Sequence, residues 1–185
     1  MSAGFPIVDD LVERWRDDWQ PVSVAKLTSI VVVGAWIAWE ASTGERWVPL
    51  LDGANLAFHE AGHLVYGVLG STAGLYGGTL GQLTFPVVAC FIFGTRREST
   101  SFAACAIWLA ENLCNIGRYA ADARAQELPL VGGGEHDWNA ILSRWGALQS
   151  DVRFGTTLHR VGVLGVVIAA VWLGYRALCR RPPRD

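Results

Sequence analysis

Charged residues are scarce in this chain. Asp, Glu, Lys and Arg make up 17% of its 185 residues, whereas hydrophobic residues make up 51%. Soluble domains carry about a quarter charged residues, and the mean hydropathy here is +0.28. The net charge of −2 lacks the basic excess that nucleic-acid binding requires. The composition therefore excludes a nucleic-acid partner and favours a protein whose partner is the lipid bilayer.

Cysteine pairs are also missing. The four cysteines form no CxxC pair, and three of them lie inside apolar runs. They are Cys90, Cys105, Cys114 and Cys179. This spacing supports neither a disulfide framework nor a cysteine metal site, so we interpret them as small buried hydrophobic residues.

The N-terminal stretch lacks the features of a signal peptide, because acidic and basic residues alternate there with apolar ones. Leu11, Trp15 and Trp19 recur at every fourth position, which is typical of one helix face. The pattern predicts a short amphipathic helix on the membrane surface over residues 1–20, followed by a single transmembrane metal-binding domain over residues 21–185.

Five apolar segments follow this stretch. They cover residues 22–41, 47–69, 73–94, 101–117 and 157–178. Each approaches the roughly 20 residues that a membrane-crossing helix needs. The third contains Gly77, Gly78 and Pro86, so we expect it to be broken and to expose backbone to which a substrate strand could pair. The predicted fold is all-α, a polytopic membrane helix bundle with about five apolar segments.

Basic residues in short segments indicate the orientation in the membrane. The C-terminal tail carries Arg176, Arg180, Arg181 and Arg184, and the loop after the third segment carries Arg96 and Arg97. Both observations predict that the C-terminus is cytoplasmic.

The second segment contains the motif His-Glu-x-x-His, in the run FHEAGHLVYG from residue 58 to residue 67. On a helix, His59 and His63 share one face and can offer two imidazoles to one metal ion. Glu60 lies beside them and is placed to act as a general base. Zinc-dependent peptidases use this arrangement, and ionisable residues inside a membrane segment are costly unless they have a role. The motif therefore predicts a Zn²⁺ site.

A catalytic zinc site needs a third protein ligand and one open position. We predict that Asp122 or His136 supplies it, with Glu111 as the alternative. Asp122 is favoured because it lies at the same helix end as the loop that bears His136, whereas Glu111 lies about 16 Å deeper along the same helix. Three glycines at residues 132–134 would let the loop that bears His136 fold inward. Tyr119, one turn before Asp122, could donate a hydrogen bond to the reaction's oxyanion or orient a ligand.

With the FHEAGH motif inside a hydrophobic segment, the chain resembles the intramembrane zinc metalloproteases of the site-2 protease class. In that family an LDG motif in a later membrane helix supplies the third ligand. The LDG of this chain, at residues 51–53, precedes the histidines instead. The resemblance implies a zinc metalloprotease but does not make Asp52 a ligand.

The chain most resembles an uncharacterised group of bacterial membrane proteins that combine a HEAGH helix with three further motifs. The first corresponds here to Gly77, Gly78, Gln82 and Pro86, the second to the run ADAR at residues 121–124 with LPL at 128–130, and the third to the HDW turn at residues 136–138. This resemblance covers about two thirds of the chain. It implies a common site and a location in the bacterial inner membrane.

These observations predict a membrane-embedded zinc metallopeptidase that hydrolyses a peptide bond in or near the bilayer, with Glu60 as general base. The substrate would be a membrane protein or peptide, selected with the help of a partner protein. Two alternatives share the same metal chemistry. One is a non-proteolytic membrane protein with a structural or sensing metal site, and the other is a metal hydrolase that acts on a lipid amide or ester.

Overall fold

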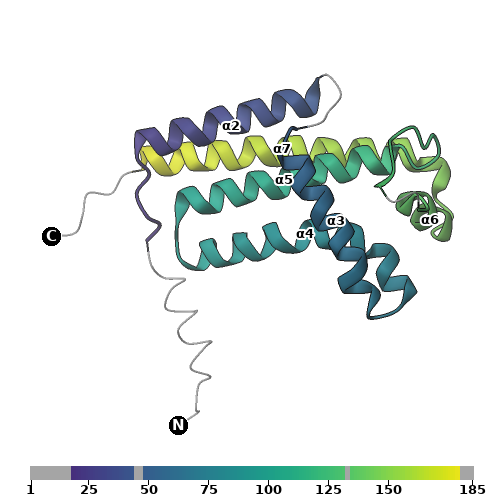
Figure 1. Cartoon of the computed structure of the whole chain (residues 1–185). Coiled ribbons are helices and arrows are strands. Elements are labelled where there is room, and N and C mark those ends of the chain that lie inside the picture. Colours follow the sequence, from purple (N-terminus) through teal and green to yellow (C-terminus); the bar gives the residue numbers. More distant parts are fainter. Residues whose placement is uncertain (1–17, 44–47, 132–133, 180–185) are drawn as a thin grey trace, which may run out of the picture.

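The computed structural model describes residues 18–43, 48–131 and 134–179 of the chain (Figure 1). In these residues it contains six α-helices, one short 3-10 helix and no strand. The elements are α2 (Val24–Ser42), α3 (Leu51–Gly67), α4 (Ser71–Thr95), α5 (Ser99–Ala121), α6 (Asp137–Arg144), η2 (Leu148–Ser150) and α7 (Asp151–Leu178). The all-α prediction is confirmed. The predicted amphipathic helix falls on residues of which nearly all lie outside the described ranges.

Three helices in the described part of the chain are long and apolar enough to cross a membrane. They span Val24–Ser42, Ser71–Thr95 and Leu148–Leu178. The predicted count of five is not confirmed, because α3 has only 17 residues and α5 carries buried polar side chains such as Glu111 and Asn112. The three long helices are compatible with a membrane protein, and they expose large apolar side chains that include Val32, Phe91 and Val171.

The long helices lie side by side (Figure 1). α7 packs against α5 and α2, α5 packs against α4, and α3 crosses the bundle to pack along α4. The short helix α6 lies where α5 ends and α7 begins, and it contacts α4 and α5. This arrangement brings the middle of α3 and the start of α6 to the same end of the bundle.

The expectation of a broken third segment is wrong. α4 is one helix of 25 residues that runs through Pro86, and Gly77 and Gly78 are buried in it. A Cβ atom on Gly77 would lie 2.6 Å from the carbonyl oxygen of Gly62, and one on Gly81 would overlap the carbonyl of Phe58. The glycines therefore let α3 and α4 approach backbone to backbone, as small residues do between membrane helices. They expose no backbone for a substrate strand.

A second glycine contact joins α5 to α7. A Cβ atom on Gly117 would lie 2.6 Å from the carbonyl oxygen of Gly155, and a Cβ atom on Gly155 would overlap the backbone of Gly117 and Ala121. Further along α7, a Cβ atom on Gly162 would lie 2.5 Å from the carbonyl oxygen of Ala110. This crossing therefore tolerates no side chain on these faces.

We expect Gly155→Ala to lower the free energy of unfolding by about 1–3 kcal/mol, because the added methyl forces the two helices apart. Gly174→Ala is the matched control on the same helix, since a Cβ atom there meets nothing within 4 Å. Thermal unfolding of both variants in one detergent measures the difference. Equal stability of the two variants would contradict the close crossing.

Candidate metal centre

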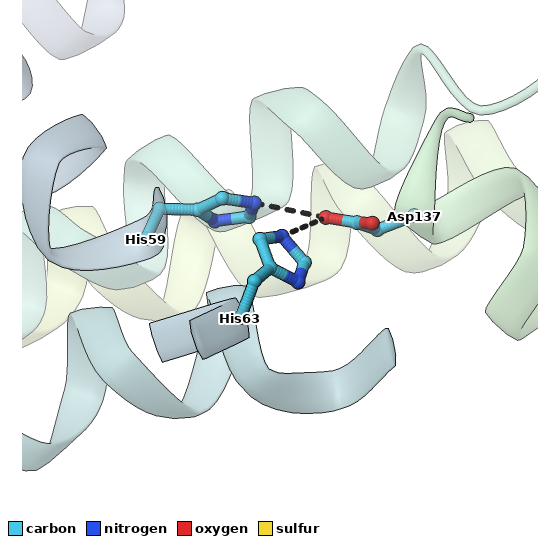
Figure 2. Close-up of side chains that lie close together, drawn as sticks. All are labelled: His59, His63 and Asp137. Atoms are coloured by element: carbon cyan, nitrogen blue, oxygen red, sulfur yellow. Dashed lines mark hydrogen bonds and ion pairs between the residues drawn. The ribbon is translucent and has the colours of Figure 1, made fainter. Parts of the chain in front are cut away.

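Two side chains of α3 and one from the start of α6 meet at the end of the bundle (Figure 2). Nε2 of His59 lies 2.8 Å from Oδ2 of Asp137, and Nε2 of His63 lies 3.0 Å from the same oxygen. One ligand atom from each residue lies within 4.8 Å of the others. These three residues could hold a metal ion.

The helical spacing of the motif has the predicted effect. The rings of His59 and His63 lie on one face of α3, with centroids 4.8 Å apart and planes 74° apart. The side chains of His59 and Asp137 are 8% and 13% exposed, whereas that of His63 is 28% exposed. The cluster is therefore largely buried but accessible from the side of His63.

The remaining ring nitrogen of each histidine faces an oxygen atom. Nδ1 of His63 lies 2.8 Å from the carbonyl oxygen of Gly74, and Nδ1 of His59 lies 3.1 Å from Oε1 of Gln82. A carbonyl oxygen only accepts hydrogen bonds, so both Nδ1 atoms donate. When such a ring is neutral, its Nε2 atom carries the lone pair, as in metal-binding histidines.

Three acceptor atoms thus converge, namely the two Nε2 atoms and Oδ2 of Asp137. Acceptors repel one another at this range, so a positive charge between them has to stabilise the arrangement. A metal ion or a bound proton supplies that charge. Two imidazoles and one carboxylate are a ligand set that suits Zn²⁺.

Gly78 keeps free the space that an ion would need. A Cβ atom on this residue of α4 would overlap Nε2 of His59 and would lie 2.6 Å from Nε2 of His63. Any larger residue at position 78 would therefore occupy the space between the two nitrogen atoms. The residues present fit a metal ion, and Gly78 belongs to the site although it offers no ligand atom.

The end of α5 fixes the position of Asp137. The backbone N–H of Asp137 donates to the hydroxyl oxygen of Tyr119 at 3.2 Å. Nδ1 of His136, the N-cap of α6, accepts from the N–H of Asn139 at 3.3 Å, and the Asn139 amide donates to the carbonyl of Ala123 at 2.7 Å. These contacts hold the first turn of α6 against α5 and direct Asp137 to the histidines.

The structure does not bring the two residues predicted as third ligand to the histidines of α3, because Asp122 and His136 face each other. Nε2 of His136 lies 3.4 Å from Oδ2 of Asp122. Asp122 also accepts from the backbone N–H groups of Glu127 and Leu128. Burial lowers the pKa of His136, against the raising effect of Asp122. Because Nδ1 accepts from the N–H of Asn139, the proton of the neutral ring is on Nε2. Both residues support the turn, and their neighbour Asp137 takes the place predicted for them.

Glu111, the alternative third ligand, does not reach the histidines either. Its Oε2 accepts from the side-chain amide of Asn55 at 2.5 Å, and it also contacts Asp52. Asn55 in turn accepts from the indole N–H of Trp108 at 2.9 Å. Glu111 therefore belongs to a buried polar cluster between α3 and α5.

The predicted catalytic residues lie beside the cluster. Glu60 is half-buried, and its carboxylate is close enough to interact electrostatically with His59 and Tyr119. The Tyr119 ring lies 5.8 Å from the His59 ring and 4.1 Å from the His136 ring, centroid to centroid. Two roles were predicted for Tyr119, stabilisation of the oxyanion and orientation of a metal ligand. Its hydrogen bond with the backbone N–H of Asp137 fits the second role. The oxyanion role stays a prediction.

Three residues of the site, Asp137, Gly78 and Gln82, were not predicted from the sequence as site residues, although the motifs that contain them were recognised. Asp137 directly follows His136, which was predicted as a ligand. Which of the two caps α6 and which reaches the histidines depends on where the helix begins, and the sequence does not fix that residue. Gly78 and Gln82 lie four positions apart on α4 and so face α3 together. The spacing alone could have indicated this shared face.

Comparison of the chain with protein-family models, with curated proteins and with solved structures finds no match.

We expect Gly78→Ala to lower the affinity for Zn²⁺ by at least about 100-fold, since a methyl group would occupy the space between the two Nε2 atoms. Gly94→Ala is the control on the same helix, because a Cβ atom there makes only ordinary contacts at 3.5 Å with Phe102. Competition with a chromophoric chelator measures both affinities. Unchanged zinc binding by Gly78→Ala would contradict the position inferred for the ion.

Asp137→Asn should weaken zinc binding more than about 100-fold, because an amide replaces the charged ligand. Asp122→Asn is the matched control in the same polar region, and we expect it to weaken binding about tenfold or less. The same chelator assay ranks the two variants. The reverse order would restore Asp122 as the third ligand.

Proposed function

We propose that this protein is a membrane-embedded zinc metallopeptidase. The observation that supports the proposal best is the meeting of the His-Glu-x-x-His histidines with Asp137. Three protein ligands leave a fourth position open, as catalytic zinc sites do, whereas structural sites usually use four. The partial exposure of His63 gives that position a route to water and substrate.

In this proposal His59, His63 and Asp137 hold the ion. When bound, zinc lowers the pKa of a water molecule toward neutrality and polarises a scissile carbonyl. Glu60 is the general base that takes the proton from the attacking water and passes it to the leaving amine. Tyr119 keeps Asp137 in place through its hydrogen bond to the backbone N–H.

The apolar surface favours a peptide substrate at the bilayer. The helices next to the site expose large apolar side chains, among them Leu64 and Val65 on α3, which directly follow His63 in the chain. A substrate segment that reaches the cluster beside His63 therefore meets an apolar surface. This location fits a membrane protein or peptide in the bacterial inner membrane, as the sequence resemblance implies.

A structural or sensing metal is the second candidate, and one observation favours it. The cluster ties α6, which packs on α4 and α5, to α3. An ion there would stabilise this end of the bundle even without hydrolysis. The two functions differ in what Glu60 does, because a structural site needs no general base.

We expect Glu60→Gln to keep its zinc and to lose hydrolysis by about 10²–10⁴-fold, because the amide cannot accept the proton. Labelled casein, quenched-fluorescence transmembrane peptides and a fluorogenic lipid amide are the probes, with the full chain in nanodiscs. Glu40→Gln on α2 is the control, since its carboxylate accepts from the Trp36 indole of the same helix at 3.2 Å.

If the zinc-loaded protein cleaves none of the probes, the structural-metal function is favoured. Cleavage of the lipid amide alone would favour the lipid hydrolase. Loss of zinc from Glu60→Gln would contradict the role of Glu60 as a base that is not a ligand.

A further inference from the structure

A buried chain of hydrogen bonds links Asp52 to His59 across three helices. The side-chain amide of Asn115 on α5 donates to Oδ1 of Asp52 at 2.5 Å, and that of Gln82 on α4 donates to Oδ1 of Asn115 at 2.9 Å. Oε1 of Gln82 faces Nδ1 of His59 at 3.1 Å. The chain begins and ends on α3. Asp52, Gln82 and His59 are all less than 10% exposed, so water cannot replace these bonds easily.

The direction of each bond is fixed by Asp52. Its Oδ2 accepts from the backbone N–H of Val48, and its Oδ1 accepts from Asn115. Because a carboxylate only accepts, Asn115 must present its NH₂ group to Asp52 and its oxygen to Gln82. Gln82 then presents its NH₂ group to Asn115 and its oxygen to His59. The last step leaves Nδ1 of His59 as a donor.

Glu111 makes Asp52 the accepting partner. The side chains of Glu111 and Asp52 are hydrogen-bonded to each other, and a hydrogen bond between two carboxyl groups requires one proton. Both oxygens of Asp52 already accept N–H groups, so the shared proton belongs to Glu111. Asp52 thus stays an acceptor although it lies inside the bundle.

We propose that Asp52 is a positioning residue, which acts through Asn115 and Gln82 to keep the proton of His59 on Nδ1 and the lone pair of Nε2 directed at Asp137. The inference rests on the proposed function, because the lone pair matters only if the cluster binds a metal ion. We call the hydrogen-bond chain Asp52–Asn115–Gln82–His59 the relay. His63 needs no such relay, since the backbone carbonyl of Gly74 fixes its Nδ1 directly. Asp52 of the LDG segment thus orients a metal ligand without contacting the metal ion.

Asp52→Asn tests the relay because it should reverse every bond. The oxygen of the new amide has to face the N–H of Val48, so its NH₂ group faces Asn115. The side-chain amides of Asn115 and Gln82 then rotate by half a turn, so that Gln82 presents its NH₂ group to His59. Nδ1 of His59 becomes an acceptor and Nε2 carries the proton. We expect zinc affinity to fall about 10–100-fold, which is typical when the partner of a ligand is lost.

Adding Gln82→Glu to Asp52→Asn should restore the affinity, because a carboxylate at position 82 again accepts from Nδ1 of His59. A packing role of Asp52 predicts the opposite, namely a harmless Asp52→Asn variant and further damage from the second change. Chelator competition on the full chain in detergent measures zinc affinity. Nitrogen-15 NMR of the metal-free, histidine-labelled protein reports whether Nδ1 of His59 is protonated, with signals assigned from His59→Gln and with His63 as internal reference.

The relay is supported if Nδ1 of His59 is protonated in the wild type, bare in Asp52→Asn and protonated again in the double variant. A protonated Nδ1 and wild-type zinc affinity in Asp52→Asn would overturn it, as would a double variant that binds as weakly as the single one. The NMR result is independent of hydrolysis. Lack of zinc binding or of cleavage by the wild type would therefore count against the proposed function and not against the relay.

Two variants of Gln82 alone give a second measurement in case Asp52→Asn fails to fold. Gln82→Glu keeps an acceptor for His59, whereas Gln82→Met fills the same space without one. The relay predicts that Gln82→Glu binds zinc the more tightly, by about 10–100-fold. Packing alone predicts the reverse order, because a buried charge is costlier than a thioether, and that order would overturn the proposal.

Discussion

The convergence of three acceptor atoms on one point is the constraint on which the site depends. Nε2 of His59 and Nε2 of His63 lie 2.8 Å and 3.0 Å from Oδ2 of Asp137, and three acceptor atoms cannot stay this close without a positive charge between them. Much of the surrounding structure keeps these atoms together. Gly74 and Gln82 direct the imidazoles, and the end of α5 holds the turn that carries Asp137.

Close packing of helices makes this convergence sterically feasible. α3 and α4 meet along glycines, so that the carbonyl of Gly74 and the amide of Gln82 come within hydrogen-bond distance of the two rings. A bundle separated by ordinary side chains would place these partners too far away, because helix axes then lie about 8–10 Å apart. At the site itself, the absence of a Cβ atom at Gly78 leaves room beside the Nε2 atoms of both histidines.

The sequence predicted the parts of this structure that depend on local spacing. The helical class, the shared face of His59 and His63 and the presence of long apolar helices follow from periodicity and composition, whereas the count of five apolar segments is not confirmed. The third ligand does not, because it depends on how α6 begins after a loop and on which of two adjacent residues caps it. His136 takes the capping position, so Asp137 reaches the site. The role of Asp52 likewise depends on contacts between α3, α4 and α5, which no local pattern encodes.

The central claim is that His59, His63 and Asp137 bind one zinc ion, and the X-ray absorption spectrum of the zinc-loaded protein tests it most directly. The account predicts about one zinc per chain, with two imidazole nitrogens and carboxylate or water oxygens as ligands at about 2.0–2.2 Å. The same spectrum recorded for Asp137→Asn should show a changed oxygen shell or no bound zinc. A wild-type protein that retains no zinc, or a spectrum with sulfur ligands or a single imidazole, would contradict the account.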